Sequence, residues 1–185
     1  GKGRVLFSRG SGVSLHHPRK QNGTQPSVGD VELTAESMSH TVRKAETAVV
    51  EAFVAECSDF DAEALVEGLA GEWEMYSEVK YDAERAKIEQ PYRVMGVDYV
   101  EGFGYSKFTF NADGTGNRYV EFTEPGEEPE TMTFEWQYDA DSHMLTLSGD
   151  NNAEYDVAGF NGDYIVCDYV YHGDNMREIL KRKAE

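Results

Sequence analysis

The sequence predicts a mainly β protein: an antiparallel, up-and-down barrel of eight strands preceded by an N-terminal helical segment. From Gly71 onward apolar and polar side chains alternate, and short runs of Gly, Asn, Asp and Pro separate the alternating segments. Connections this short join neighbouring strands antiparallel. Such a meander with one apolar face closes into a barrel, because closure removes exposed strand edges.

Length and charge exclude several classes of protein. The 185 residues suffice for one domain with its own core, and no apolar run approaches the 18 or so residues of a membrane span. The formal net charge is −18, although residues 1–28 carry five basic residues and no acidic one. The acidic body would repel a phosphate backbone, which argues against nucleic acid as a partner. We interpret residues 1–29 as a basic leader or linker rich in Gly and Ser.

Residues 30–70 carry the helical signals. Apolar residues recur at spacings of three and four, which predicts an amphipathic helix over 35–56. Its expected packing stripe comprises Met38, Val42, Ala45, Val49 and Phe53. A second start signal at Ser58, followed by Asp61, predicts a shorter helix that ends near Gly68.

Residues 71–185 carry the strand signals. The clearest alternation, over 131–138, places Phe134 and Trp136 on the inner face and Glu135 on the outer. In the first strand the same rule turns Trp73 and Val79 inward and Glu78 outward. Residues 81–104 are less regular and predict a wide loop. We expect the barrel to open there, near the small residues Ser77, Gly104 and Ala153.

Several short motifs resemble a known family when they are taken in order. They are Gly71-Glu72-Trp73, the hairpin Phe108 to Gly116, Phe134-Glu135-Trp136, Leu145-Thr146-Leu147 and Lys181-Arg182. Together they resemble the lipocalin-like domains of secreted bacterial lipoproteins, over about 71–185. The resemblance implies structural roles for Gly71, Trp73 and Arg182: the tryptophan closes the barrel base and the arginine packs across it. Arg177 is the competing candidate.

The resemblance also implies a location and a type of function. It implies an exported protein that is periplasmic, anchored to the outer membrane or secreted, with a lipid anchor upstream of this sequence. It implies binding and not catalysis. The sequence agrees, because no catalytic or metal-binding motif is recognisable and the predicted inward positions contain no acid or base. No cofactor is expected.

Two binding functions remain open. In the first, the barrel holds a small apolar or amphipathic ligand against aromatic side chains. The candidate ligand-binding residues are Phe110, Phe122, Phe134, Trp136, Tyr155 and Tyr164. In the second, the barrel is filled and its surface serves a protein partner. Cys57 and Cys167 either bridge the helical segment to the barrel or remain two buried thiols.

Overall fold

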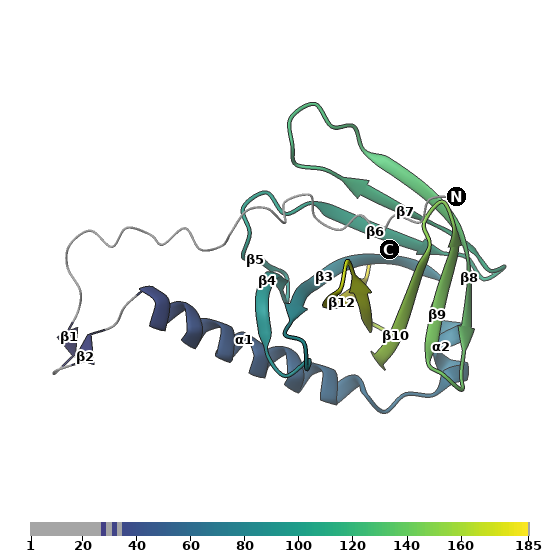
Figure 1. Ribbon diagram of the computed structural model, residues 1–185. Helices are drawn as coiled ribbons and strands as arrows, with labels where there is room; N and C mark the ends of the chain where they lie inside the picture. Colours follow the sequence, from purple (N-terminus) through teal and green to yellow (C-terminus); the bar gives the residue numbers. More distant parts are fainter. Residues whose placement is uncertain (1–26, 29–30, 33–34, 185) are drawn as a thin grey trace.

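The computed structural model describes residues 27–28, 31–32 and 35–184, and most of the predicted leader lies outside them. Eight antiparallel strands form a closed ring, because the last strand pairs with the first (Figure 1). The predicted eight-stranded barrel is therefore confirmed. The ring consists of β3 (Gly71–Tyr81), β6 (Tyr105–Phe110), β7 (Thr115–Glu121), β8 (Glu130–Asp139), β9 (Met144–Gly149), β10 (Ala153–Phe160), β11 (Tyr164–Tyr171) and β12 (Asp174–Arg182).

An additional hairpin takes the place of the predicted wide loop. Strands β4 (Ile88–Val94) and β5 (Val97–Asp98) extend the sheet beside the second half of β3, while β6 pairs with its first half. After the hairpin, Val100 and Phe103 are buried in the core, and the Phe103 ring stacks on Tyr92 with centroids 5.7 Å apart. These hydrophobic side chains cover this side of the barrel. Of the small residues expected beside an opening, Ala153 lines a cleft in the barrel wall.

An extra residue in β3 changes which side chains face the interior. Ile179 and Leu180 are adjacent in β12, but their partners in β3 are Ser77 and Met75, so Tyr76 has no partner across that pair of strands. This β-bulge shifts the alternation by one residue. Before it, Trp73 and Met75 pack in the barrel core; after it, Val79 and Tyr81 pack in the outer hydrophobic cluster. The inward placement expected for Val79 and Ser77 was therefore wrong.

The N-terminal part of the described chain contains two helices and a small two-stranded sheet of β1 (Ser27–Val28) and β2 (Val31–Glu32). Helix α1 spans Ala35–Cys57, one residue beyond the predicted end. Helix α2 spans Ala62–Gly68, and its N-cap is Asp61, whose carboxylate accepts from the Glu63 N–H. Neither helix combines the length and hydropathy needed to cross a membrane.

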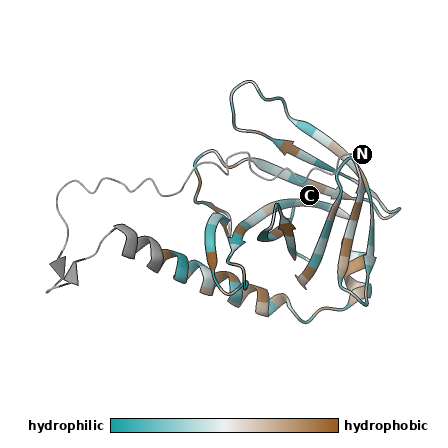
Figure 2. Cartoon of the chain, viewed as in Figure 1, coloured by the Kyte–Doolittle hydropathy of each residue, from teal (hydrophilic) through white to brown (hydrophobic). Residues whose placement is uncertain are grey.

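The C-terminal half of α1 packs on the outside of the barrel, while its N-terminal half extends beyond it (Figure 1). Val50 and Val54 enter a cluster with outward residues of β3, β11 and β12, and Figure 2 shows the apolar positions along this half of the helix. The packing stripe is thus displaced from the predicted one. Val42 and Val49 are exposed, because the barrel contacts a neighbouring face of the helix.

The base of the barrel is held by Arg182. Its guanidinium lies 4.3 Å from the centre of the buried Trp73 ring. It also donates to the carbonyls of Gly68 and Ala70, which are left without helical partners at the end of α2. Arg177 lies instead on the outer face of β12, where it binds Asp168. Arg182 therefore connects α2, the first strand and the last strand.

The docking of α1 predicts a contrast between two adjacent valines. Val50→Asp places a carboxylate in the outer cluster, and we expect it to lower the free energy of unfolding by about 3 kcal/mol. Val49→Asp, on the exposed face, should change it by about 0.5 kcal/mol or less. Urea denaturation of the two variants gives both values. Equal effects would contradict the packing of α1.

Candidate ligand-binding site in the barrel

Aromatic rings dominate the interior of the barrel. Phe108 and Phe110 stack with ring centroids 5.9 Å apart, and Phe134 lies 5.5 Å from Phe110. Tyr155 meets Phe108 edge-on at 6.5 Å and Tyr169 at 5.4 Å. All five rings are buried, so strands β6, β8, β10 and β11 together build one apolar wall.

Three of the six predicted ligand-binding residues, Phe110, Phe134 and Tyr155, lie in this wall. Trp136 is only partly buried at its edge, where its indole N–H donates to the Asn111 carbonyl at 3.0 Å. Phe122 follows the end of β7 and belongs to neither hydrophobic cluster. Tyr164 lies on the outer face, with its ring 5.0 Å from that of Phe53 on α1, because the inward side chains of β11 are those at odd positions from 165 to 169. The placement of Tyr164 inside the barrel was wrong, whereas that of the half-buried Phe122 stays a prediction.

A polar cluster that the sequence analysis missed lies within the aromatic interior. The side chains of Glu78, Arg118 and Glu178 are each 0% exposed. Glu78 and Glu178 are directly opposite each other on β3 and β12, a pairing that brings two carboxyl groups together on one face. The expectation of an interior without an acid or base was therefore wrong. For Glu78 the bulge at Tyr76 is the reason, whereas Arg118 and Glu178 follow the regular alternation of β7 and β12.

Neighbouring side chains hold this cluster in place. The Tyr169 hydroxyl donates to Oε1 of Glu78, and Nε of Arg118 donates to the Ser106 hydroxyl at 3.0 Å. The Arg118 guanidinium also lies 5.0 Å from the centre of the Phe108 ring. Strands β3, β6, β7, β11 and β12 therefore all contribute to one buried polar group.

The two carboxyl groups are protonated more readily than ordinary glutamates. Burial raises the pKa of Glu178 to about 7, although the charge of Arg118 opposes the shift. Burial and the charge of Glu178 raise the pKa of Glu78 well above its usual value. Two like charges this close in a low-dielectric interior do not both persist, so the pair shares a proton.

Several atoms of the cluster lack hydrogen-bond donors. Among the described residues, none donates to Oε2 of Glu78, to either carboxyl oxygen of Glu178 or to the Tyr155 hydroxyl. The shared proton satisfies one contact between the two carboxyl groups. Buried oxygens without a donor are costly in a protein interior and are normally met by water or a ligand.

A cleft of about 740 Å³ opens on the side of the barrel next to this cluster. Strands β10 and β11 pair only from Asp156 and Asp168 onward; the preceding residues of β10 pair only with β9. The cleft forms where the two strands separate. Its lining includes the core residues Leu147 and Tyr169, together with the half-buried Ala153. Because the Tyr169 hydroxyl reaches Glu78, this side chain connects the cleft to the polar cluster.

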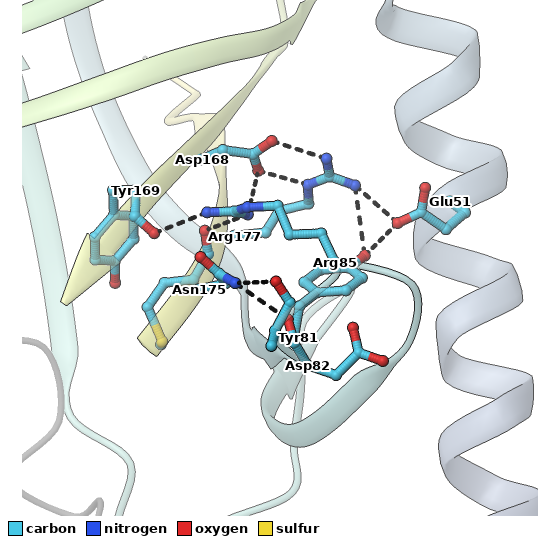
Figure 3. A network of polar contacts seen from close by, with 10 residues as sticks. Glu51, Tyr81, Asp82, Arg85, Asp168, Tyr169, Asn175 and Arg177 are labelled. Atoms are coloured by element: carbon cyan, nitrogen blue, oxygen red, sulfur yellow. Dashed lines mark hydrogen bonds and ion pairs between the residues drawn. The ribbon is translucent and has the colours of Figure 1, made fainter. Parts of the chain in front are cut away.

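A network of charged groups fixes one edge of the cleft (Figure 3). Arg177 binds both oxygens of Asp168, at 2.6 and 2.9 Å, and reaches Glu51 on α1 at 2.8 Å. Arg85, from the loop after β3, donates to the Tyr169 carbonyl at 3.1 Å and lies 3.7 Å from Asp168. The network ties α1 and this loop to β11, so the cleft has a firm border.

Among the described residues, neither the cysteines nor a cluster of metal-ligating side chains forms a reactive centre. Cys57 and Cys167 are both free and buried, Cys57 at the end of α1 outside the barrel and Cys167 in its core. They do not bridge the helix to the barrel. Burial raises the pKa of the Cys167 thiol well above its usual value, so it is a poor nucleophile at neutral pH. No group of three or more metal-ligating side chains occurs in the part of the chain that the structure describes.

Comparison with known proteins places this barrel in a family. A family model described as a lipocalin-like domain matches residues 69–167, more than half of the chain. The chain belongs to the lipocalin-like domain family. Among solved structures, this lipocalin-like chain is similar to a deswapped triple mutant of bovine odorant binding protein, with 14% identity and a TM-score of 0.37 over 64% of this chain and 76% of that one. No curated protein matches it.

The buried pair predicts an unusual pH dependence for this lipocalin-like barrel. Between the unfolded pKa near 4.5 and the raised folded values, the folded protein binds more protons than the unfolded chain. The free energy of unfolding contributed by the pair should therefore fall as pH rises from about 4.5 toward 7. Glu178→Gln removes the like charge, and we expect it to reduce this fall and to stabilise the protein by about 2 kcal/mol at pH 8.

Denaturation of the two proteins from pH 4.5 to 8 measures the effect. Glu135→Gln, on the exposed face of β8, is the matched control and should leave the pH dependence unchanged. If Glu178→Gln kept the wild-type slope, the buried pair would not carry the effect.

Proposed function

We propose that this protein is a non-catalytic binding protein whose barrel holds a small amphipathic molecule. The observation that supports this proposal is that buried oxygens of Glu78, Glu178 and Tyr155 accept no hydrogen bond from the described residues. These oxygens lie beside the aromatic wall. The apolar part of the ligand would pack against Phe108 and Phe134, and its polar end would meet the oxygens. Membership of the lipocalin-like family supports binding of small ligands.

The chemistry of the interior supports binding over catalysis. A carboxyl pair that shares a proton is also found in aspartic proteases, but there it faces a substrate groove. Here both carboxyl groups are fully buried, and the nearby Cys167 carries a thiol whose raised pKa makes it unreactive. The described residues therefore offer a polar anchor for a ligand without an activated nucleophile.

We further propose that the protein works outside the cytoplasm, as a periplasmic, membrane-anchored or secreted protein. The support is the resemblance of Gly71-Glu72-Trp73, the Phe108 hairpin and Lys181-Arg182 to lipocalin-like domains of secreted bacterial lipoproteins. Locating the tagged full-length protein by cell fractionation tests this part of the proposal. Recovery in the cytoplasmic fraction would contradict it.

Binding predicts a fluorescence response from the two tryptophans. Trp73 lies in the core and Trp136 packs at its edge, so N-phenyl-1-naphthylamine, a neutral aromatic probe, should quench their emission on entering the barrel. Ala153→Trp narrows the cleft and should weaken probe binding at least tenfold, whereas Ala112→Trp in the exposed β6–β7 turn should not. No quenching by the probe would contradict the proposal and leave the alternative, a filled barrel that contacts a protein partner.

A further inference from the structure

Four buried acceptor atoms of the polar cluster accept no hydrogen bond from the described residues. Three are carboxyl oxygens of Glu78 and Glu178, and the fourth is the Tyr155 hydroxyl. Arg118, the basic residue of the cluster, already donates to Ser106 and lies against the Phe108 ring. The vacant contacts therefore call for a group that donates several hydrogen bonds.

The charges of the cluster also favour a ligand that donates hydrogen bonds. With one proton on the carboxyl pair, the remaining carboxylate balances Arg118. A ligand that carries an ammonium group keeps this balance if the shared proton leaves as the ligand enters, because both carboxylates then face two cations. A ligand carboxylate would place a third acidic group beside the pair, and two protons would have to be held there.

The cleft supplies an independent reason to favour a cation. Its charged lining comprises the acidic residues Glu154, Asp156 and Asp168 and one basic residue, Arg85, which already binds Asp168. The chain as a whole has a formal net charge of −18. An acidic opening in an acidic protein concentrates cations and repels anions.

We propose that the ligand is a small amine whose ammonium group binds between Glu78 and Glu178 and whose apolar part lies against the aromatic wall. This inference rests on the function proposed above and specifies the chemical class of its ligand. The ammonium group donates to the vacant carboxyl oxygens, and the shared proton passes to solvent. Binding and deprotonation of the pair are thus coupled.

Other charged and titratable groups surround the carboxyl pair and set the pH at which the ammonium group replaces the shared proton. Arg118 favours the ionised pair, and so does Arg93 on β4. The hydroxyl of Tyr169 stabilises the ionised form of Glu78 by its hydrogen bond. The remaining titratable groups that face the pair are Tyr92 on β4, Tyr155 on β10 and Cys167 on β11.

Three ligands of matched shape test the ligand class: 2-phenylethylamine, 2-phenylethanol and 3-phenylpropanoate. Isothermal titration of the full chain at pH 7 should show the amine binding at least tenfold more tightly than the alcohol, and the carboxylate binding least. Titration in buffers of different ionisation enthalpy should show proton release on amine binding. The amine affinity should rise from pH 5.5 to 7.5, since the amine stays protonated while the pair becomes easier to deprotonate; the alcohol affinity should stay constant.

Variants identify the carboxyl pair as the amine site. Glu178→Gln and, separately, Glu78→Gln should lower amine affinity at least tenfold and abolish proton release while leaving the alcohol affinity unchanged. A thermal melt checks that each variant is folded, and the use of two variants keeps the test valid if one of them fails that check. Glu135→Gln, on the outer face of β8, should bind all three ligands as the wild type does.

The outcomes separate this inference from the proposed function. Equal affinities for amine and alcohol, or amine binding that survives both glutamate variants, would overturn the amine class and leave a binding barrel. Tightest binding of the carboxylate, with proton uptake, would also overturn it. Failure of all three ligands and of the naphthylamine probe would overturn the proposed function itself.

Discussion

The single extra residue in β3 is the constraint on which the rest of the structure depends. Because Tyr76 has no partner in β12, the residues before and after it obey opposite alternations. Trp73 and Glu78 therefore both point into the barrel although they are an odd number of residues apart. Without the bulge, Glu78 would face outward and Val79 would take its place in the core.

The same bulge creates the surface on which α1 docks. It turns Val79 and Tyr81 outward, where Val166 and Ile179 from the neighbouring strands join them. An apolar patch on the outside of a barrel has to be covered, and Val50 and Val54 of α1 cover it. The change of register in β3 thus has two results in the same part of the barrel. It places Glu78 in the interior, and it places on the exterior the apolar side chains that α1 covers.

The interior acids are a cost to stability that a purely structural core would not carry. Hydrophobic residues of similar volume in place of Glu78 and Glu178 would remove both the desolvation penalty and the repulsion between like charges. The chain instead surrounds the pair with Arg118 and Tyr169, which reduce the penalty without removing it. Groups that destabilise a fold and lie beside a cleft are characteristic of sites that serve a ligand.

The sequence by itself determined the barrel. The period of two, the turn residues between strands and Gly71-Glu72-Trp73 depend on local geometry, and each is visible over a few residues. The start of α1 at Ala35, its end to within one residue, and the inward placement of Phe110 and Phe134 followed from the same local rules.

Only the tertiary structure decided the site. Alternation is a reliable guide while a strand stays regular, but whether Tyr76 bulges depends on its pairing with β12, which is distant in the sequence. The faces of Glu78 and of α1 depend on such long-range pairing, so no local pattern could assign them. Glu78, expected on the outer face, became part of a buried pair with Glu178, because register is a property of two strands and not of one.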